Sequence, residues 1–185
     1  MAQRLSGYVR VPDEQYETVP WPVHALLHHL PKPQCAWDPC DRGDGLLIDT
    51  LLRCKINAIG TEHDFLLINE PPIKADTIVC NPPYGENRRG ELAVAFIAHA
   101  LKLKVPRVAM LLRNDFDSAI TRKHLFRNEP RFAFKLVLLN RIKWFEGPSS
   151  PSDNHSWFVW MQDNEDLPTI RYIGREEAMH DKAAP

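Results

Sequence analysis

The feature that most constrains the fold is a short apolar run that two prolines bring to an end. Residues 76–80 are mostly apolar and β-branched, a pattern that predicts a buried strand. Pro82 and Pro83 stop that strand at once, because proline has no N–H to donate to a neighbouring strand. We call Asn81-Pro82-Pro83-Tyr84 the corner. It predicts a stiff turn at the carboxyl end of a strand, where open α/β sheets bind their ligands.

The corner has the groups needed for alkyl transfer to an exocyclic amine. The side-chain oxygen of Asn81 and the carbonyl of Pro82 can accept the two hydrogens of a planar amino group, which aims the nitrogen lone pair at an electrophile. Tyr84 can stack on the ring that carries the amine. An ordinary turn accounts for the same four residues, since Asn-Pro and Pro-Pro are common turn dipeptides. The choice therefore depends on the rest of the chain.

A second pattern predicts a cofactor site. A strand ending at Asp38 is followed by a loop with Gly43 and Gly45 and by a helix over 46–54. This order is typical of nucleotide-cofactor binding in doubly wound folds. The strand end and the loop hold three aspartates, which would repel a pyrophosphate. They favour a cationic cofactor with an amino-acid end, such as S-adenosylmethionine.

The next strand, over 56–61, ends at Glu62, an acid placed to hold a ribose. Asp76 lies only fourteen positions after Glu62, too short a distance for a helix and a strand. We therefore expect a sheet trimmed at this edge, with Asp64 and Phe65 in the pocket for the cofactor's base.

The fold class that these patterns predict is α/β. The sheet is a three-layer, Rossmann-like one, mostly parallel with an antiparallel last strand. We expect one domain over 1–174, in which 1–15 is a mobile arm, and a frayed tail over 175–185. Further elements are expected as helices over 23–30, 91–104 and 116–126 and as strands over 105–112, 132–139, 157–161 and 169–173.

Composition excludes several classes of protein. No apolar run approaches the length of a membrane span, and the N-terminus lacks the apolar core of a secretory signal. We expect a cytoplasmic protein with no membrane contact. The four cysteines form no CxxC pair, so free thiols are expected and no metal site.

The distribution of charge favours an anionic partner. Net charge is −1, yet residues 81–143 hold thirteen Lys and Arg against five Asp and Glu. Arg88 and Arg89 directly after the corner, and Arg122 with Lys123 beyond it, are the candidates for phosphate contacts. A solvated helical surface is the competing explanation.

With both sites in view, the chain resembles the small stand-alone adenine-N6 methyltransferases of DNA, which depend on S-adenosylmethionine and are frequent in phage and prophage genomes. The resemblance covers roughly residues 14–161. It implies that the corner, Asn81, Pro82, Pro83 and Tyr84, is catalytic. Trp144 or Phe145, on a loop beyond the opposite strand, is the candidate for closing the other face of the target adenine, and core packing is the alternative for either. The residues that the resemblance assigns to the cofactor are Tyr16, Thr18, Asp38, Pro39, Gly43, Gly45, Glu62, Asp64 and Phe65.

The sequence departs from that family in two respects. Three residues separate Pro39 from Gly43, where the family usually has two. We expect no separate target-recognition domain, so target choice would come from the loops at 85–90 and 141–155 or from a partner protein or oligomer. Methylation of adenine in RNA or of a protein glutamine, and an inactive cofactor-binding remnant that serves as an interaction module, remain as alternatives.

Overall fold

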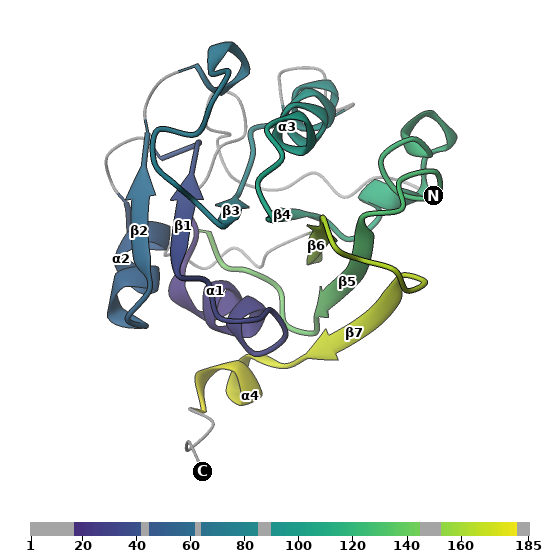
Figure 1. The fold of residues 1–185 in the computed structure, drawn as a ribbon. Helices are drawn as coiled ribbons and strands as arrows, with labels where there is room; N and C mark the ends of the chain where they lie inside the picture. The colour runs from purple at the N-terminus through teal and green to yellow at the C-terminus, as the bar shows by residue number, and fades with distance from the viewer. Residues whose placement is uncertain (1–16, 42–44, 62–63, 85–89, 145–152, 181–185) are drawn as a thin grey trace.

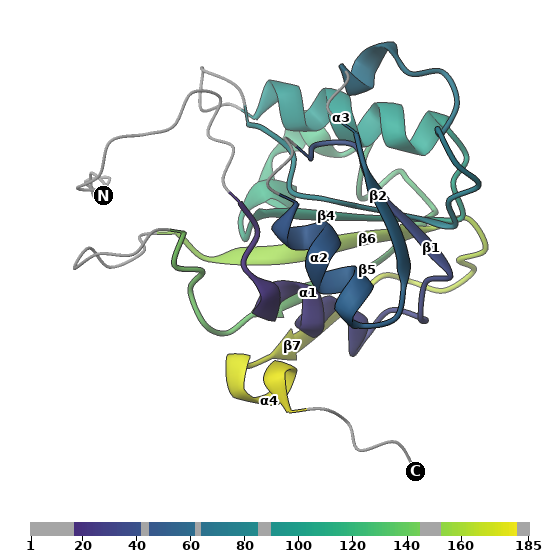
Figure 2. The same cartoon turned by 90° about the vertical axis from the view of Figure 1, so that its left-hand side faces the viewer.

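The computed structural model describes residues 17–41, 45–61, 64–84, 90–144 and 153–180. A seven-stranded sheet lies between two layers of helices (Figure 1). The view turned by 90° shows α3 on one face of the sheet and α1, α2 and α4 on the other (Figure 2). The predicted three-layer α/β architecture is therefore confirmed.

The elements follow the predicted order. The strands are β1 (Cys35–Asp38), β2 (Asn57–Gly60), β3 (Thr77–Cys80), β4 (Arg107–Arg113), β5 (Phe132–Leu138), β6 (His155–Met161) and β7 (Thr169–Ile173). The helices are α1 (Pro20–Leu27), α2 (Leu46–Arg53), α3 (Glu91–Lys102) and α4 (Arg175–Met179), with three-residue 3-10 helices η2 (Phe65–Leu67), η3 (Phe116–Ser118) and η4 (Ile120–Arg122). In the described part of the chain, no helix is long and apolar enough to cross a membrane.

The order of the strands creates a switch point between β1 and β3. The sheet runs β2-β1-β3-β4-β6-β5-β7, so the chain leaves β1 for β2 on one side and returns to β3 on the other. Strand β6 is antiparallel to both β4 and β5, and the other neighbouring strands pair in parallel. Between β2 and β3 the described residues form only η2, which confirms the trimmed edge.

Side chains of the central strands alternate between two cores. Along β6, Trp157 and Val159 pack with α1 and α2, while Phe158 and Trp160 pack with α3. All four are at most 1% exposed. Because β6 is covered on both faces, its sequence from 157 to 161 is a continuous apolar run, as expected of a central strand. This packing fixes the ends of the central strands, on which the candidate site is built.

The prediction of a helix over 116–126 is wrong. The segment forms η3 and η4 instead, separated by Ala119 in an extended conformation. Local polar groups compete for the backbone, as the hydroxyl of Ser118 donates to the carbonyl of Asp115 at 2.6 Å. Short polar side chains favour turns over helix interiors for this reason.

The tail beginning at residue 175 was expected to be frayed, and for residues 175–179 that expectation is wrong. These residues form α4, and Ala178 is only 2% exposed. Ala178 belongs to the core that contains residues of α1, so burial of this small apolar side chain holds the short helix in place. Residues 181–185 lie outside the described part.

Candidate functional site at the ends of β1 and β3

The structure brings the corner and the first predicted cofactor residue to the switch point. Asp38 is the last residue of β1, and Asn81 directly follows β3, its parallel neighbour. Their exposed fractions are 6% and 9%. Pro39, Pro82 and Pro83 are buried as well. Polar groups at the carboxyl ends of the two strands that flank a switch point are where open α/β sheets bind ligands.

Tyr84 is held by the end of β4. Its hydroxyl accepts the backbone N–H of Arg113, and the Arg113 guanidinium lies over the Tyr84 ring, 4.8 Å from the centroid. Phe116 packs edge-on at 6.3 Å between centroids. Burial raises the pKa of the Tyr84 phenol, so the hydroxyl stays neutral at physiological pH. The ring that was predicted to stack on a base therefore has Arg113 on one face in this structure.

The loop after β1 is organised by Asp41, which the sequence analysis did not single out as a site residue. Its carboxylate accepts the N–H of Gly45 at 3.2 Å, and Gly45 has a φ of +56°. The same side chain lies against Gly60, where a Cβ would come within 1.8 Å of the carboxylate. Only glycine fits at the end of β2 for this reason. Asp41 is one of the three residues between Pro39 and Gly43. Its contacts with Gly45 and Gly60 therefore anchor the lengthened loop to the start of α2 and to the end of β2.

Asp64 and Phe65 follow β2 in the chain. Asp64 is exposed and caps η2 by accepting the N–H of Leu66 at 3.1 Å. Phe65 is 1% exposed and packs edge-on against Trp37, with 5.5 Å between centroids, and against His99 at 4.8 Å. Core packing accounts for Phe65, and its place in a cofactor pocket stays a prediction.

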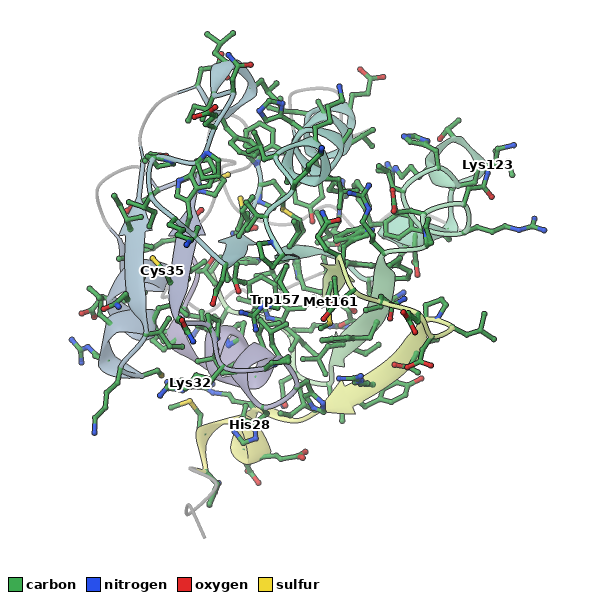
Figure 3. All side chains as sticks on the ribbon, in the orientation of Figure 1. His28, Lys32, Cys35, Lys123, Trp157 and Met161 are labelled. Atoms are coloured by element: carbon green, nitrogen blue, oxygen red, sulfur yellow. The ribbon has the colours of Figure 1, made fainter. Side chains whose placement is uncertain are left out.

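The predicted phosphate contacts differ in how far they are engaged. Arg122 lies 3.8 Å from the centroid of the Phe116 ring and donates to the Phe116 carbonyl at 2.8 Å. The pKa of this guanidinium is lowered, and burial is the largest of several causes. Lys123 is exposed and projects from the segment after β4 (Figure 3). Lys123 is thus the better placed of the two for an external anion.

Part of the basic surplus is neutralised inside the protein. Among the described residues, three ion pairs involve cations of the segment 81–143, at N···O distances of 2.6 to 3.0 Å. They are Arg107 with Asp76, Arg131 with Glu129, and Lys135 with Asp117. Glu129 and Asp117 are already among the five acids counted in that segment, so only the pair with Asp76 lowers its surplus of cations further.

His155 is a candidate that the sequence analysis did not identify. It opens β6 opposite Arg113, and its ring packs edge-on against Trp144 at 5.1 Å. It is 6% exposed, and its Nδ1 has no hydrogen-bond partner among the described residues. Burial lowers the pKa of His155 to about 4, so the imidazole is neutral at pH 7. Buried polar atoms without partners are rare, and they occur at functional sites. Histidine at the start of an apolar strand is the only sequence signal.

Of the remaining predicted residues, the structure describes only Thr18. Thr18 is 4% exposed, and Val19, not Thr18, is the N-cap of α1. The remaining candidates lie outside the described residues: Tyr16, Gly43, Glu62, Arg88, Arg89 and Phe145.

Comparison with known proteins shows the fold and goes no further. No protein-family model matches the chain, and no curated protein does. Among solved structures, the chain is similar to a Listeria monocytogenes protein described as a class I S-adenosylmethionine-dependent methyltransferase (TM-score 0.53, 11% identity, 85% of this chain and 64% of that one). It is also similar to a Vibrio vulnificus protein described as the modification subunit of a type I restriction enzyme (TM-score 0.52, 14% identity, 86% of this chain and 47% of that one). The chain thus spans less than two thirds of either neighbour, and what it shares with both is the α/β fold.

Proposed function

We propose that this chain transfers the methyl group of S-adenosylmethionine to the 6-amino group of adenine in DNA. The observation that carries the proposal is the position of the corner. Asn81-Pro82-Pro83-Tyr84 follows β3 at the switch point, beside the buried carboxylate of Asp38 at the end of β1. The chain shares its fold with a protein described as a class I methyltransferase, and the reaction is argued from the groups at the site.

The switch point suits the proposed cofactor. Asp38 offers a buried carboxylate for the cationic amino-acid end, and Gly45 and Gly60 let the backbone and Asp41 approach closely. A diphosphate would be repelled by Asp38 and Asp41. S-adenosylmethionine would supply a methyl group on a sulfonium sulfur, which is a good leaving group.

The corner would bind and orient the acceptor amine. The Asn81 side-chain oxygen and the Pro82 carbonyl would accept the two amine hydrogens. Held in this way, the amine would present its lone pair to the methyl group that the cofactor would supply, and its surplus proton would pass to water. A base within a duplex cannot reach this point, so the adenine must be flipped out or single-stranded.

A stacked adenine would need both faces of its ring covered. Tyr84 would cover one face after the Arg113 guanidinium leaves the position that it holds over the ring. Trp144, beside His155, is the described candidate for the other face. Arg113, once displaced from the ring, would meet the phosphate next to the flipped base.

Two observations favour nucleic acid over a protein glutamine. Residues 81–143 carry an excess of cations directly after the corner. One structural neighbour is described as part of a restriction enzyme. RNA shares the same acceptor amine, so DNA is the narrower part of the proposal.

The test of the proposal is a transfer assay with radiolabelled methyl groups on matched acceptors. Unmethylated DNA, an RNA of the same sequence and a mixture of denatured proteins are incubated with the chain and cofactor. Label confined to DNA, and recovered as N6-methyladenine after digestion, is the expected result. Label in RNA or in glutamine would show that this other acceptor, and not DNA, is the substrate. Absence of label, together with normal cofactor binding, would support the interaction module.

Asp38→Ala should weaken binding of S-adenosylmethionine about tenfold or more, because the cationic end of the cofactor loses its buried partner. Titration calorimetry gives the affinity. Asp49→Ala is the matched control, since Asp49 lies on the surface of α2 in an exposed pair with Arg53. Wild-type affinity in Asp38→Ala would remove Asp38 from the cofactor site.

Lys123→Ala and Arg122→Ala should separate an external contact from an internal one. Loss of Lys123 should lower the slope of log affinity for DNA against log salt by about one, with the unfolding temperature unchanged. Loss of Arg122 should lower the unfolding temperature, because Phe116 loses the stacked guanidinium. An unchanged salt slope for Lys123→Ala would show that Lys123 makes no phosphate contact and is an ordinary solvated surface residue.

A further inference from the structure

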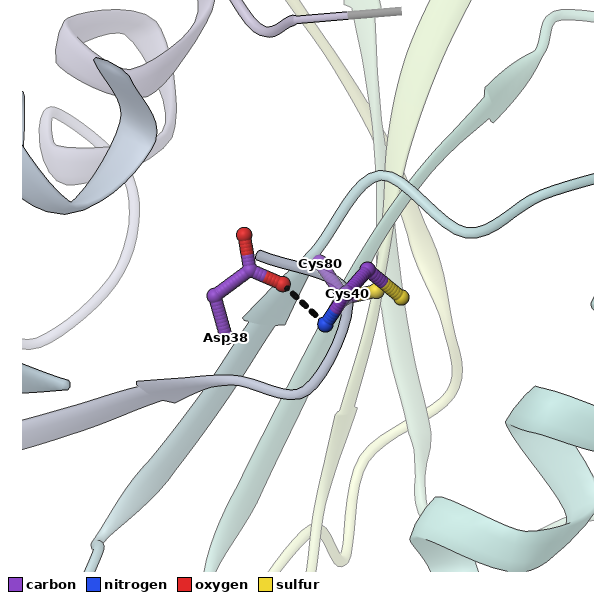
Figure 4. A group of neighbouring side chains, drawn as sticks. All are labelled: Asp38, Cys40 and Cys80. Carbon is purple, nitrogen blue, oxygen red and sulfur yellow. Dashed lines mark hydrogen bonds between the residues drawn. The ribbon is translucent and has the colours of Figure 1, made fainter. Parts of the chain in front are cut away.

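Three side chains with metal-binding atoms meet at the switch point. Asp38 ends β1, Cys40 follows two residues later, and Cys80 ends β3 (Figure 4). One carboxylate oxygen and the two sulfurs lie within 4.8 Å of one another. Asp38 and Cys80 are buried and Cys40 is half-buried, so the group is reached from the side of Cys40. The parallel pairing of β1 with β3 brings Asp38 and Cys80 side by side, and the N–H of Cys40 donates to the Asp38 carboxylate at 2.9 Å, which holds Cys40 beside them.

The spacing fits a small tetrahedral cation. Zn–S bonds of about 2.3 Å and a Zn–O bond of about 2.1 Å place two sulfurs about 3.8 Å apart and each sulfur about 3.6 Å from the oxygen. Both separations fall inside the 4.8 Å limit of the three donors. Small rotations about the side-chain bonds would complete the geometry, with no movement of the strands.

The types of donor select the metal. Two sulfurs disfavour Mg²⁺ and Ca²⁺, which prefer oxygen, and favour Zn²⁺. We propose that Asp38, Cys40 and Cys80 form a binding site for Zn²⁺, with a fourth position open to water. Binding would release the two thiol protons, because thiolates are the ligands.

This site has a consequence that rests on the proposed function. Asp38 is also the proposed partner of the cofactor's amino-acid end, so one carboxylate cannot serve both at once. Zn²⁺ and S-adenosylmethionine would then exclude each other. Cys80 directly precedes Asn81, so the bound metal would also lie beside the catalytic corner.

The chain carries a natural control for the metal site. Cys54 lies 3.7 Å from Nδ1 of His24, a pair of donors from α1 and the end of α2, away from the carboxyl ends of β1 and β3. Two donors hold Zn²⁺ less well than three. Substitution of Cys54 therefore tests whether any thiol with a neighbour suffices.

The experiment titrates Zn²⁺ into the reduced, cofactor-free protein against a chelating dye, with Co²⁺ as a spectroscopic probe. One Zn²⁺ per chain and a sulfur-to-cobalt absorption band are expected. Cys40→Ser should weaken Zn²⁺ binding about tenfold or more and remove the band, while Cys54→Ser should change neither. Because Cys80 is fully buried, Cys40→Ser is the decisive variant.

Wild-type Zn²⁺ affinity in Cys40→Ser, or loss of binding in Cys54→Ser, would overturn the metal site. Competition is measured separately, by repeating the titration with saturating S-adenosylmethionine, and weaker Zn²⁺ binding is expected. If the protein binds no S-adenosylmethionine at all, the proposed function fails, and the titration without cofactor still decides the metal site.

Discussion

Asn81→Ala is expected to lower methyl transfer at least about 100-fold while cofactor affinity stays within about twofold of the wild type. The substitution removes one of the two acceptors that would orient the amine, and loss of one preorganised polar contact in an active site costs about 10²–10³ in rate. Single-turnover transfer to DNA gives the rate, and calorimetry gives the affinity. Asn81 is buried at the end of β3, so unfolding curves must accompany both.

Asn57→Ala is the matched control, because Asn57 is an exposed amide at the start of β2. It should transfer at the wild-type rate. Transfer by Asn81→Ala at a rate near the wild type would show that the corner is a turn and not an active site. Loss of cofactor affinity together with transfer would instead place Asn81 in the cofactor pocket.

The sheet could be predicted from the sequence because its strands are short apolar runs with clear ends. Two prolines ended β3, and a proline after Asp38 ended β1, so both strand ends that form the site were visible. The segment 116–126 was predicted wrongly, because its apolar residues have helical spacing while Ser118 and its polar neighbours bind the backbone locally. The spacing of apolar residues gives no information about side chains that compete for hydrogen bonds of the backbone.

The parts of the site that were not predicted depend on contacts distant in the sequence. Asp41 matters because its side chain fills the space beside Gly60, nineteen residues further on. His155 matters because burial leaves its Nδ1 without a partner among the described residues. Neither property belongs to the residue type or its spacing, so no pattern along the chain indicates it.

Charge shows the same limit. The count of cations in residues 81–143 is correct, but it does not tell which of them pair inside the protein. Lys135 binds Asp117 and the carbonyl of Asn114, and Arg131 binds Glu129 through two nitrogens. Predictions about DNA must therefore rest on exposed cations such as Lys123.

Tyr84 is expected to contribute to stability as well as to catalysis. Tyr84→Ala should lower the free energy of unfolding by about 3–5 kcal/mol, because a large ring that is 6% exposed leaves a cavity beside Phe116. Tyr84→Phe should cost about 1–3 kcal/mol, since the N–H of Arg113 loses its acceptor. Stacking needs only the ring, so Tyr84→Phe should keep most of the transfer activity and Tyr84→Ala should lose it.

Denaturant unfolding and transfer, both at a temperature where each variant is folded, separate the two contributions. Tyr172→Phe is the control, because Tyr172 is 59% exposed on β7 and should change neither quantity. A Tyr84→Phe variant as stable as the wild type would refute the structural role of the hydroxyl. A folded Tyr84→Phe variant without transfer would show that the hydroxyl, and not the ring, serves the reaction. That result would refute the proposal that adenine stacks on Tyr84.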